Sequence, residues 1–414
     1  MPERRAYPGF RRRTLLLAVA ALFVAACPSL ARDWYVSVTG QPGAAGTEAD
    51  PTELFSALFR AAAGDTVIMR GGTYSLSKQV FLERENLTLR NYPGEKPVLS
   101  MPVDNPSLSS VVWPYARGCR VIGLEIIGGA WYCVKMDFPD CVLKDCVIHG
   151  SGHDAVKIAR PADGCQVLSC EIYDTGKTYP SNAEGIDNVA CDDVVVRECY
   201  IHHTATNGLY MKGGASRSII ERNFVTDTGG HGIMLGQSTD LDLIRNPPYE
   251  CRDGIARNNI VVRTQYSGLA FEAAYNCKHY NNTLYDVAKT GGAGISVHAN
   301  EHDTPSKNVF VFNNIAVVLS TRPMFFVHPN GLAAKADMQC DYNLYYNPQA
   351  HYAFWWEPGP NYYNSFGAWQ AGTPFDAHSL CADPMLDIAH GFRPLPGSPA
   401  IRRGASPSPA AAKP

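Results

Sequence analysis

The sequence lacks the features that mark several large classes of protein. Its 36 lysines and arginines are balanced by 39 aspartates and glutamates, so there is no basic excess of the kind that binds nucleic acid. The chain is also not acidic enough to suggest disorder. Clear helical periodicity is scarce in the middle of the chain, where glycines and Asn-Asn or Asn-Gly pairs are frequent. This pattern favours a turn-rich, all-β protein.

The apolar run near the N-terminus is too short to span a bilayer, and it has the flanks of an export signal. Three arginines at 11–13 precede it, and it extends to Ala26. We therefore expect residues 1–31 to be a signal peptide and the mature protein to be secreted or periplasmic.

Two other targeting signals compete with this interpretation. The box Val24-Ala-Ala-Cys27 resembles that of a bacterial lipoprotein, in which Cys27 would carry a lipid and tie the protein to the cell envelope. The segment Arg12-Arg-Thr-Leu-Leu16 resembles a twin-arginine signal. Apart from a lipid on Cys27, we expect no contact with a membrane.

The five-residue segment Lys144-Asp-Cys-Val-Ile148 is the first of seven similar segments along the chain. Its central residue returns after 24, 29, 24, 36, 23 and 32 residues, at Cys146, Cys170, Cys199, Asn223, Asn259, Asn282 and Asn314. Such a period with occasional insertions is typical of a solenoid in which each repeat forms one coil. We therefore predict an all-β, single-stranded, right-handed parallel β-helix.

Stacked coils, about 4.8 Å apart, place equivalent residues above one another. The four asparagines should then form a ladder whose amides bond to turn backbone groups and to each other. The thirteen cysteines also fall into columns, such as Cys146, Cys170 and Cys199, or Cys119, Cys141 and Cys165. Disulfides are common in exported proteins, but the columns favour stacked, buried free thiols.

A second predicted strand precedes each of these segments. The series comprises residues 132–136, 154–158, 184–188, 207–211, 231–235, 267–271 and 293–297. Apolar residues at the third and mostly the fifth places should point inward, and the fourth and sixth places should point outward. Charge gathers on the outward side in only a few neighbouring coils.

Three carboxylates in this region, Asp154, Glu184 and Asp187, are predicted to face solvent on a rigid sheet at a spacing that suits Ca²⁺. Lys212 is one coil beyond Asp187 and two residues along the strand, roughly 8 Å away by rung spacing and strand rise. The carboxylates are candidate metal ligands, although Asp154 and Glu184 could instead cap turns. Lys212 is a candidate catalytic base, although an outward lysine can simply be solvated.

Other residues border the same patch. His231 is a second catalytic candidate, or a histidine that only packs in the turn column. Asn207 and Tyr210 lie beside the carboxylates and are candidate substrate-binding residues. Insertions at 176–181, 237–250 and 299–306 interrupt coils next to this ladder, as loops that build a binding cleft do. They and their flanks carry the remaining substrate-binding candidates, which suit a sugar acid: Tyr179, Arg245 and Arg252.

We expect residues 32–403 to form one domain with closed ends. A short apolar-faced helix near residues 54–63 should cover the open N-terminal coil. After about residue 340 the repeat fades into an aromatic-rich segment, which we expect to plug the other end. Residues 404–414 are rich in proline and alanine and should form a disordered tail.

Over nearly its whole length the chain resembles the pectate-lyase-like β-helix superfamily of polysaccharide-active enzymes. The strand Trp34-Tyr-Val-Ser37, the run 63–74 and the ending 392–401 are typical of its bacterial members. This resemblance implies the fold more strongly than the activity.

Two enzyme families match the centre. Glu184-Gly-Ile-Asp187 and Asn207-Gly-Leu-Tyr-Met-Lys212 are similar to the calcium motif and the lysine-bearing strand of polysaccharide lyase family 9, with Glu in place of an Asp and two residues between Leu209 and Lys212. That resemblance implies that Asp154, Glu184 and Asp187 bind calcium and that Lys212 is the Brønsted base.

Glycoside hydrolase family 28 supplies the second resemblance. Asn182-Ala-Glu-Gly185 and Gly230-His-Gly232 look like two of its three motifs, but Thr206-Asn207 stands where the family has a carboxylate pair. Inverting hydrolysis needs an acid and a base on opposite faces of the sugar, so this family is the second choice.

The leading hypothesis is therefore a lyase that cleaves an acidic, uronic-acid-containing polysaccharide by calcium-assisted β-elimination, with Lys212 as the base. The alternatives are a polygalacturonase-like hydrolase, a uronate epimerase and a non-catalytic glycan-binding surface protein. We expect a monomer that binds acidic polysaccharide and no nucleic acid.

Overall fold

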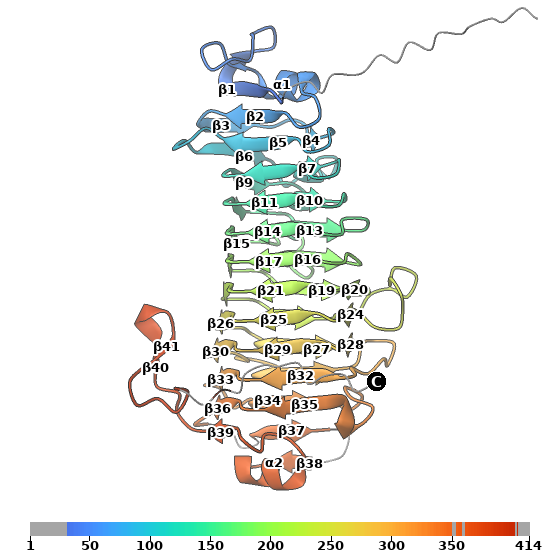
Figure 1. Cartoon of the computed structure of the whole chain (residues 1–414), viewed down its shortest axis with the longest axis vertical. Helices are drawn as coiled ribbons and strands as arrows, with labels where there is room; N and C mark the ends of the chain where they lie inside the picture. Colours follow the sequence, from blue (N-terminus) through green and yellow to red (C-terminus); the bar gives the residue numbers. More distant parts are fainter. Residues whose placement is uncertain (1–30, 350–352, 358–360, 402–403, 405–414) are drawn as a thin grey trace, which may run out of the picture.

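The computed structural model describes residues 31–349, 353–357, 361–401 and 404, and these residues form one elongated solenoid (Figure 1). Three parallel sheets run along its length, and each coil contributes one short strand to each sheet. Neighbouring strands within a sheet come from successive coils, so almost all pairing is between coils. The predicted right-handed parallel β-helix is confirmed.

The three long sheets each contain twelve strands. Sheet 1 contains β1 (Asp33–Gln41), β2 (Thr66–Met69), β5 (Thr88–Asn91), β8 (Arg120–Ile122), β11 (Val142–Lys144), β14 (Gln166–Leu168), β17 (Val195–Arg197), β21 (Ile219–Glu221), β25 (Ile255–Arg257), β29 (Lys278–Tyr280), β32 (Val309–Phe312) and β35 (Met338–Asp341). Sheet 2 contains β4 (Val80–Leu82), β7 (Ser110–Pro114), β10 (Tyr132–Met136), β13 (Val156–Ala159), β16 (Ile186–Val189), β19 (Leu209–Lys212), β23 (Ile233–Leu235), β27 (Leu269–Glu272), β31 (Ile295–His298), β34 (Phe325–Val327), β37 (Phe354–Trp356) and the antiparallel β38 (Asn361–Tyr363). Sheet 3 contains β3 (Gly72–Ser75), β6 (Pro97–Met101), β9 (Glu125–Gly128), β12 (Val147–His149), β15 (Glu171–Tyr173), β18 (Tyr200–His202), β22 (Phe224–Thr226), β26 (Ile260–Val262), β30 (Thr283–Tyr285), β33 (Ile315–Val317), β36 (Leu344–Tyr346) and β39 (Leu380–Cys381).

The remaining elements are short. A three-stranded sheet flanks the solenoid with β20 (Ala215–Ser216), β24 (Cys251–Arg252) and β28 (Ala274–Tyr275). The others are the helices α1 (Leu54–Arg60) and α2 (Phe366–Gly372), the 3-10 turns η1 (Lys335–Asp337) and η2 (Ile388–His390), and the antiparallel pair β40 (Leu386–Asp387) and β41 (Arg393–Pro394).

A tight turn joins sheet 1 to sheet 3 in most coils, and the predicted cysteine and asparagine column supports it. The residue before each column member has positive φ, for example 53° at Asp145 and 55° at Asn258. Non-glycine residues adopt this conformation at a cost of about 1 kcal/mol, so the turn needs bonded partners. Asn259 supplies them: its Oδ1 accepts from the backbone N of Asn223 at 3.0 Å, and its Nδ2 donates to Asn282 Oδ1 at 3.0 Å. The asparagine ladder is confirmed.

Cysteine and asparagine share the column because both donate to the same kind of backbone carbonyl. Cys199 Sγ donates to the carbonyl oxygen of Val167 at 3.5 Å, and Asn223 Nδ2 donates to that of Val196 at 3.1 Å. All twelve cysteines within the described ranges are free, and eleven of them are buried. The expectation of stacked thiols is thus confirmed for these residues.

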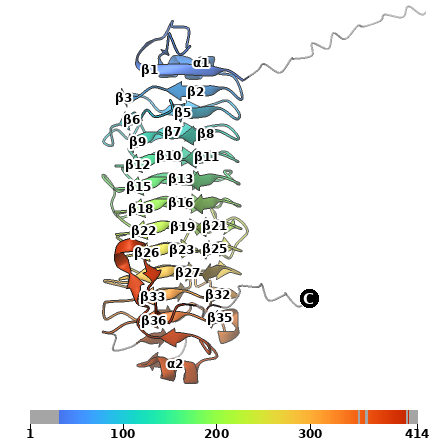
Figure 2. The ribbon, with the colours of Figure 1, turned by 60° about the vertical axis from the view of Figure 1, so that its left-hand side comes forward.

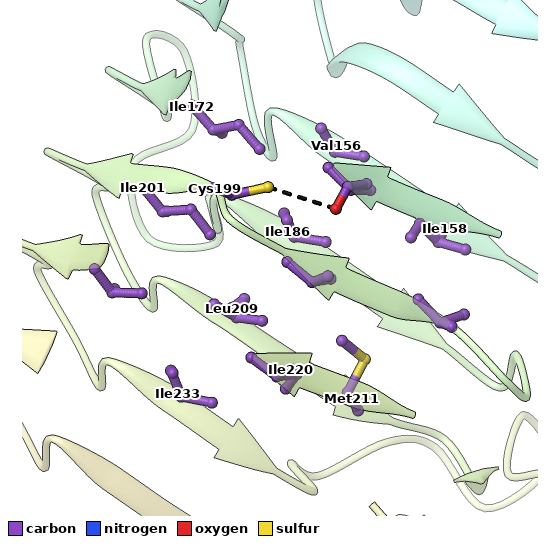
Figure 3. Close-up of a cluster of buried hydrophobic side chains, with 14 of the residues drawn as sticks. Val156, Ile158, Ile172, Ile186, Cys199, Ile201, Leu209, Met211, Ile220 and Ile233 are labelled. Carbon is purple, nitrogen blue, oxygen red and sulfur yellow. Dashed lines mark hydrogen bonds between the residues drawn. The ribbon is translucent and has the colours of Figure 1, made fainter. Parts of the chain in front are cut away.

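The core consists of apolar side chains that point inward from the three sheets. Val156 and Ile158 of β13, and Ile186 of β16, are fully buried and face residues from the other two sheets, such as Ile201 of sheet 3 and Ile220 of sheet 1 (Figure 3). The third and fifth places of the second ladder therefore point inward, as predicted. The regular strands begin later than predicted in most coils, because pairing in sheet 2 is regular only after the glycine at the second place.

Both ends of the solenoid are covered. The short helix α1 buries Leu54 and Ala57 against the first coil, as predicted. At the other end, Trp369 of α2 is fully buried and packs on Phe354 at 5.1 Å between ring centroids. The aromatic segment thus closes this end, as predicted.

The prediction that the repeat fades after residue 340 was wrong. Pairing continues to β39, and Asn343 extends the asparagine ladder by accepting from Asn314 Nδ2 at 3.1 Å. The long loop after β36 interrupts the sequence repeat while the coils continue to stack. Beyond it, Leu386 and Phe392 pack on Val262 and Val317 of sheet 3, and Figure 2 shows this lobe beside the solenoid.

Several predictions concern residues outside the described ranges. The signal peptide, the lipoprotein box with Cys27 and most of the C-terminal tail fall there. Within the ranges that are described, no helix is long and apolar enough to cross a membrane.

Candidate active site

The three predicted metal ligands come together on the outer face of sheet 2. One carboxylate oxygen from each of Asp154, Glu184 and Asp187 lies within 4.8 Å of the other two. Asp154 and Glu184 precede β13 and β16 by two residues, and Asp187 lies within β16. We call these three residues the acidic triad.

The prediction that these carboxylates face solvent was wrong, since Asp154, Glu184 and Asp187 are only 2%, 3% and 2% exposed. They point away from the apolar core, but side chains from neighbouring coils cover them. Lys157 and Tyr210 lie on either side of Asp187 in register across β13, β16 and β19. A sequence pattern specifies which way a strand residue points but not what covers it.

Hydrogen bonds between successive coils hold the start of each strand. Asp154 Oδ1 accepts from the backbone N of Glu184 at 3.1 Å. Glu184 Oε1 accepts from Thr206 Oγ1 at 2.7 Å and from Asn207 Nδ2 at 3.2 Å. Asn207 Oδ1 in turn accepts from the backbone N of His231 at 2.9 Å. The predicted substrate-binding residue Asn207 is therefore buried and positions Glu184.

Glycine follows each of these residues because the coils approach closely here. A Cβ atom on Gly185 would lie 2.6 Å from the carbonyl oxygen of Gly208, and one on Gly208 would lie 2.5 Å from that of Gly232. No side chain fits at such distances, which explains the repeated glycine at the second place of the ladder.

Lys157 supplies a positive charge inside the acidic triad. Its ammonium pairs with Asp187 and lies 3.8 Å from Asp154 Oδ2. Burial lowers the pKa of Lys157, but Asp187 and Asp154 more than offset that effect, so its pKa is raised and it stays charged.

The cluster retains an excess of negative charge. Burial, and then the neighbouring Asp187 and Glu184, raise the pKa of Asp154 well above its usual value. Burial and Asp187 likewise raise the pKa of Tyr210, so this phenol remains neutral. Two buried oxygens, Glu184 Oε2 and Asp187 Oδ1, have no hydrogen-bond partner. Unpartnered carboxylate oxygens at this spacing fit a hard divalent cation such as Ca²⁺.

Lys212 lies beside the triad in an open groove. Its ammonium is 4.6 Å from the centroid of the Tyr210 ring, and among the residues that the structure describes it has no ion pair within 4.0 Å. The groove has a volume of about 600 Å³, and we call it the lysine groove. It is lined by Lys157, Ala159, Arg160, Val189, Ala190, Lys212, Ser238, Thr239, Asp240, Asp242, Leu243 and Glu301.

Two of the predicted insertions build the far wall of the lysine groove, where the loop after β23 projects beside β24 (Figure 1). The buried Glu250 joins them: it accepts from the backbone N of Gly213 at 2.9 Å, from the backbone N of Thr239 at 3.0 Å and from Asn300 Nδ2 at 3.1 Å. One carboxylate therefore fixes both loops against the strand end that carries Lys212.

The two predicted substrate-binding arginines contact other residues of the protein and do not line the groove. Arg245 pairs with Asp163 at 2.7 Å, and the Arg252 guanidinium lies 4.9 Å from the Tyr249 ring and 5.4 Å from the Tyr275 ring. Neither arginine lines the lysine groove.

His231 lies one coil beyond Asn207; its Nδ1 is buried without a hydrogen-bond partner, and its ring centroid lies 5.5 Å from that of Tyr266. Burial lowers its pKa to about 4, so its imidazole is neutral near pH 7. Glu272 is a titratable group on this face that the sequence did not reveal. Burial raises its pKa to about 7, and it accepts from Ser238 Oγ at 2.7 Å.

Tyr179 lies in a second pocket, of about 630 Å³, at the opposite end of the strands. We call it the aromatic pocket, and it is lined by Val103, Asp104, Pro106, Ala130, Trp131, His153, Thr178, Tyr179 and Asn182. The His153 ring stacks between Trp131 at 4.3 Å and Tyr179 at 4.7 Å. Sequence reasoning missed Trp131 and His153, although each directly precedes the first place of a ladder strand.

Comparisons with known proteins agree with this architecture. Residues 34–229 match the family model described as "Pel9A-like, right handed beta helix region". Pectate lyase L of Thermoclostridium stercorarium is 24% identical over 301 residues, which are 64% of this chain and 24% of that protein. The chain therefore spans about a quarter of the length of this curated relative.

Solved structures share the fold at low identity. The pectate lyase Pel9A has a TM-score of 0.55 at 13% identity, over 76% of this chain and 80% of its own. The GH136 lacto-N-biosidase from Eubacterium ramulus has a TM-score of 0.55 at 13% identity, over 78% of this chain and 67% of its own. The mannuronan C-5 epimerase AlgE6 A-module of Azotobacter vinelandii has a TM-score of 0.51 at 14% identity, over 84% of this chain and 87% of its own. A lyase, a hydrolase and an epimerase thus share this architecture, so the choice among them depends on the site.

Proposed function

We propose that this chain, a pectate-lyase-like right-handed β-helix, is a lyase that cleaves uronic-acid-containing polysaccharide by β-elimination, with Lys212 as the base. One observation carries the proposal: a buried acidic triad with two unpartnered oxygens adjoins an open groove that contains Lys212. The curated sequence relative named above is a pectate lyase, and residues 34–229 match a Pel9A-like family model, which supports a lyase at the level of reaction class.

Asp154, Glu184 and Asp187 would hold a Ca²⁺ ion. Bound there, Ca²⁺ would neutralise the carboxylate of a uronate and make its C5 proton more acidic. Three protein carboxylates leave coordination positions for substrate and water, because Ca²⁺ takes six to eight oxygens. Lys157 limits the net negative charge of the triad and lines the groove that substrate would enter.

Lys212 performs the proton transfer in this mechanism. Its amine nitrogen takes the C5 proton, and the C5–H electron pair forms the C4–C5 double bond. The C4–O bond breaks, its electron pair leaves with the glycosidic oxygen, and that oxygen takes a proton from water. The freedom of Lys212 from ion pairs in the described structure suits this role, and Lys157 lines the same groove.

The decisive experiment measures absorbance from unsaturated products and new reducing ends together. The mature protein is incubated with a panel of acidic polysaccharides, with calcium or with a chelator. We expect both signals to rise together with calcium, and Lys212→Ala to lower the rate at least 100-fold. Lys278→Ala is the matched control, because Lys278 also lies over an aromatic ring, that of Phe310, on the different sheet 1. Full activity of Lys212→Ala would rule out the mechanism.

Glu272 favours a second candidate, a hydrolase. A partly buried carboxyl with a pKa of about 7 suits a general acid, and it lies on the same face as the triad. This reading predicts reducing ends without unsaturation, and their loss in Glu272→Gln. An epimerase would share the base Lys212 but would leave the chain length of the polymer unchanged.

A further inference from the structure

The aromatic pocket and the lysine groove lie at opposite ends of the same strands. His153 and Trp131 directly precede Asp154 and Tyr132, whereas Ala159 ends β13 and Arg160 follows it on the other side of the triad. From residue 153 to residue 159 the strand rise amounts to about 20 Å. A polysaccharide that contacts both regions therefore runs across the solenoid, parallel to the strands, and passes over the triad.

The two regions differ in charge. The lysine groove contains Lys157, Arg160 and Lys212 together with acidic loop residues. The aromatic pocket contains no lysine or arginine, and its single formal charge is Asp104. A carboxylate in this pocket would meet no lysine or arginine and would lie near one acid.

The shape and exposure of the aromatic pocket suit a sugar ring without charge. Trp131 is 41% exposed and Tyr179 is 51% exposed, so their apolar surface is open to a ligand. Large exposed aromatic surface in a concave site marks binding of an apolar face. Thr178 and Asn182 add hydroxyl and amide groups that can bond sugar hydroxyls.

We propose that the aromatic pocket binds an uncharged sugar unit next to the uronate held over the triad, so that the substrate is a heteropolymer of uronic acid and neutral sugar. This inference rests on the proposed function for the position of the uronate. It narrows the substrate class and excludes pure polyuronates as the preferred polymers.

The test is a comparison of binding that needs no turnover. Lys212→Ala protein is titrated, with calcium present, with four oligosaccharides of equal length: oligogalacturonate, oligomannuronate, a hyaluronan fragment, and a fragment of alternating galacturonate and rhamnose. We expect at least one alternating fragment to bind at least ten-fold more tightly than both polyuronates. Equal or tighter binding of a polyuronate overturns the inference.

Substitutions in the aromatic pocket test whether this pocket causes the tighter binding of alternating fragments. Trp131→Ala and Tyr179→Ala, each added to Lys212→Ala, should abolish the preference for alternating fragments over polyuronates, whereas Trp131→Phe should largely retain that preference. Tyr200→Ala is the matched control, since Tyr200 is an exposed ring stacked on His202 at 4.1 Å in sheet 3. A preference that survives both alanine variants, or that is lost in the Tyr200 control, overturns the assignment of the pocket. These outcomes concern binding alone, so they are distinct from a failure of lyase activity, which the product assay reports.

Discussion

Lys157 and Asp187 lie side by side in β13 and β16, and their ammonium and carboxylate form a partly buried ion pair inside the acidic triad. The same ammonium is 3.8 Å from Asp154. A cation that belongs to the chain thus already interacts with two of the three proposed calcium ligands. Calcium affinity should therefore depend on this lysine as much as on the carboxylates.

The first prediction concerns Lys157→Met. Without the ammonium the triad has one more net negative charge, so we expect the Kd for Ca²⁺, measured by calorimetry, to fall at least ten-fold. In chelator the variant should lose about 3 kcal/mol of unfolding free energy, because a buried carboxylate loses its partner. Added calcium should restore most of that loss. An unchanged Kd would show that the triad does not bind calcium.

The second prediction concerns the pH dependence contributed by Glu272. Burial raises its folded pKa from 4.5 to about 7, so the folded protein holds a proton that the unfolded chain releases. Its contribution to stability is present below pH 4.5 and is lost as the pH rises through 7. Glu272→Gln should remove this loss, so the variant should gain up to about 3 kcal/mol relative to wild type between pH 4.5 and 8. Chemical denaturation across this range measures the difference.

The third prediction has the opposite sign. His279 is fully buried between coils, and burial lowers its pKa to about 4. Its neutral form contributes stability above pH 6.5 that is lost as the pH falls through 4. Relative to His279→Leu, wild type should lose about 3 kcal/mol between pH 7 and pH 4. Parallel denaturation curves for the two proteins at every pH would contradict this prediction.

The fourth prediction tests the asparagine ladder. Asn259→Ala removes the acceptor of Asn223 and the donor to Asn282 and to the carbonyl of Ile220. We expect a loss of at least about 3 kcal/mol of unfolding free energy, since several buried polar groups lose their partners. Asn330→Ala, which removes one exposed bond to Asp303, is the control and should change stability little.

Asn259→Cys provides a sharper comparison within the same column. Cys199 shows that a thiol can donate to the carbonyl of the preceding coil, so cysteine should cost less than alanine at this position. Equal losses for the two substitutions would mean that the ladder does not stabilise the turns through this bond.

The repeat made the solenoid and the direction of most side chains predictable, because a period of two within each strand and one coil per repeat leave few alternatives. Asp154, Glu184 and Asp187 were predicted to meet for this reason. The burial of these carboxylates was not predicted, because it depends on Lys157 and Tyr210, which cover Asp187 from neighbouring coils. The sequence of a single strand does not indicate how side chains pack between coils.

Other parts of the site depend on contacts between distant loops. Glu250 is separated from its partner Asn300 by 50 residues, and neither lies in a repeated position. Arg245 pairs with Asp163 across 82 residues. An arginine in an insertion loop therefore looked like a ligand for a sugar acid, whereas in the folded chain it meets a carboxylate of the solenoid itself.

The cysteine columns also have a consequence for dynamics. Eleven of the twelve cysteines in the described part of the chain are buried and unpaired, at positions from Cys119 to Cys340. A thiol reagent can reach such a residue only when its coil opens, and coils of a solenoid contact only their neighbours. The rate at which each cysteine is alkylated would thus give the opening free energy of its own coil, and the series would show where along the axis unfolding begins.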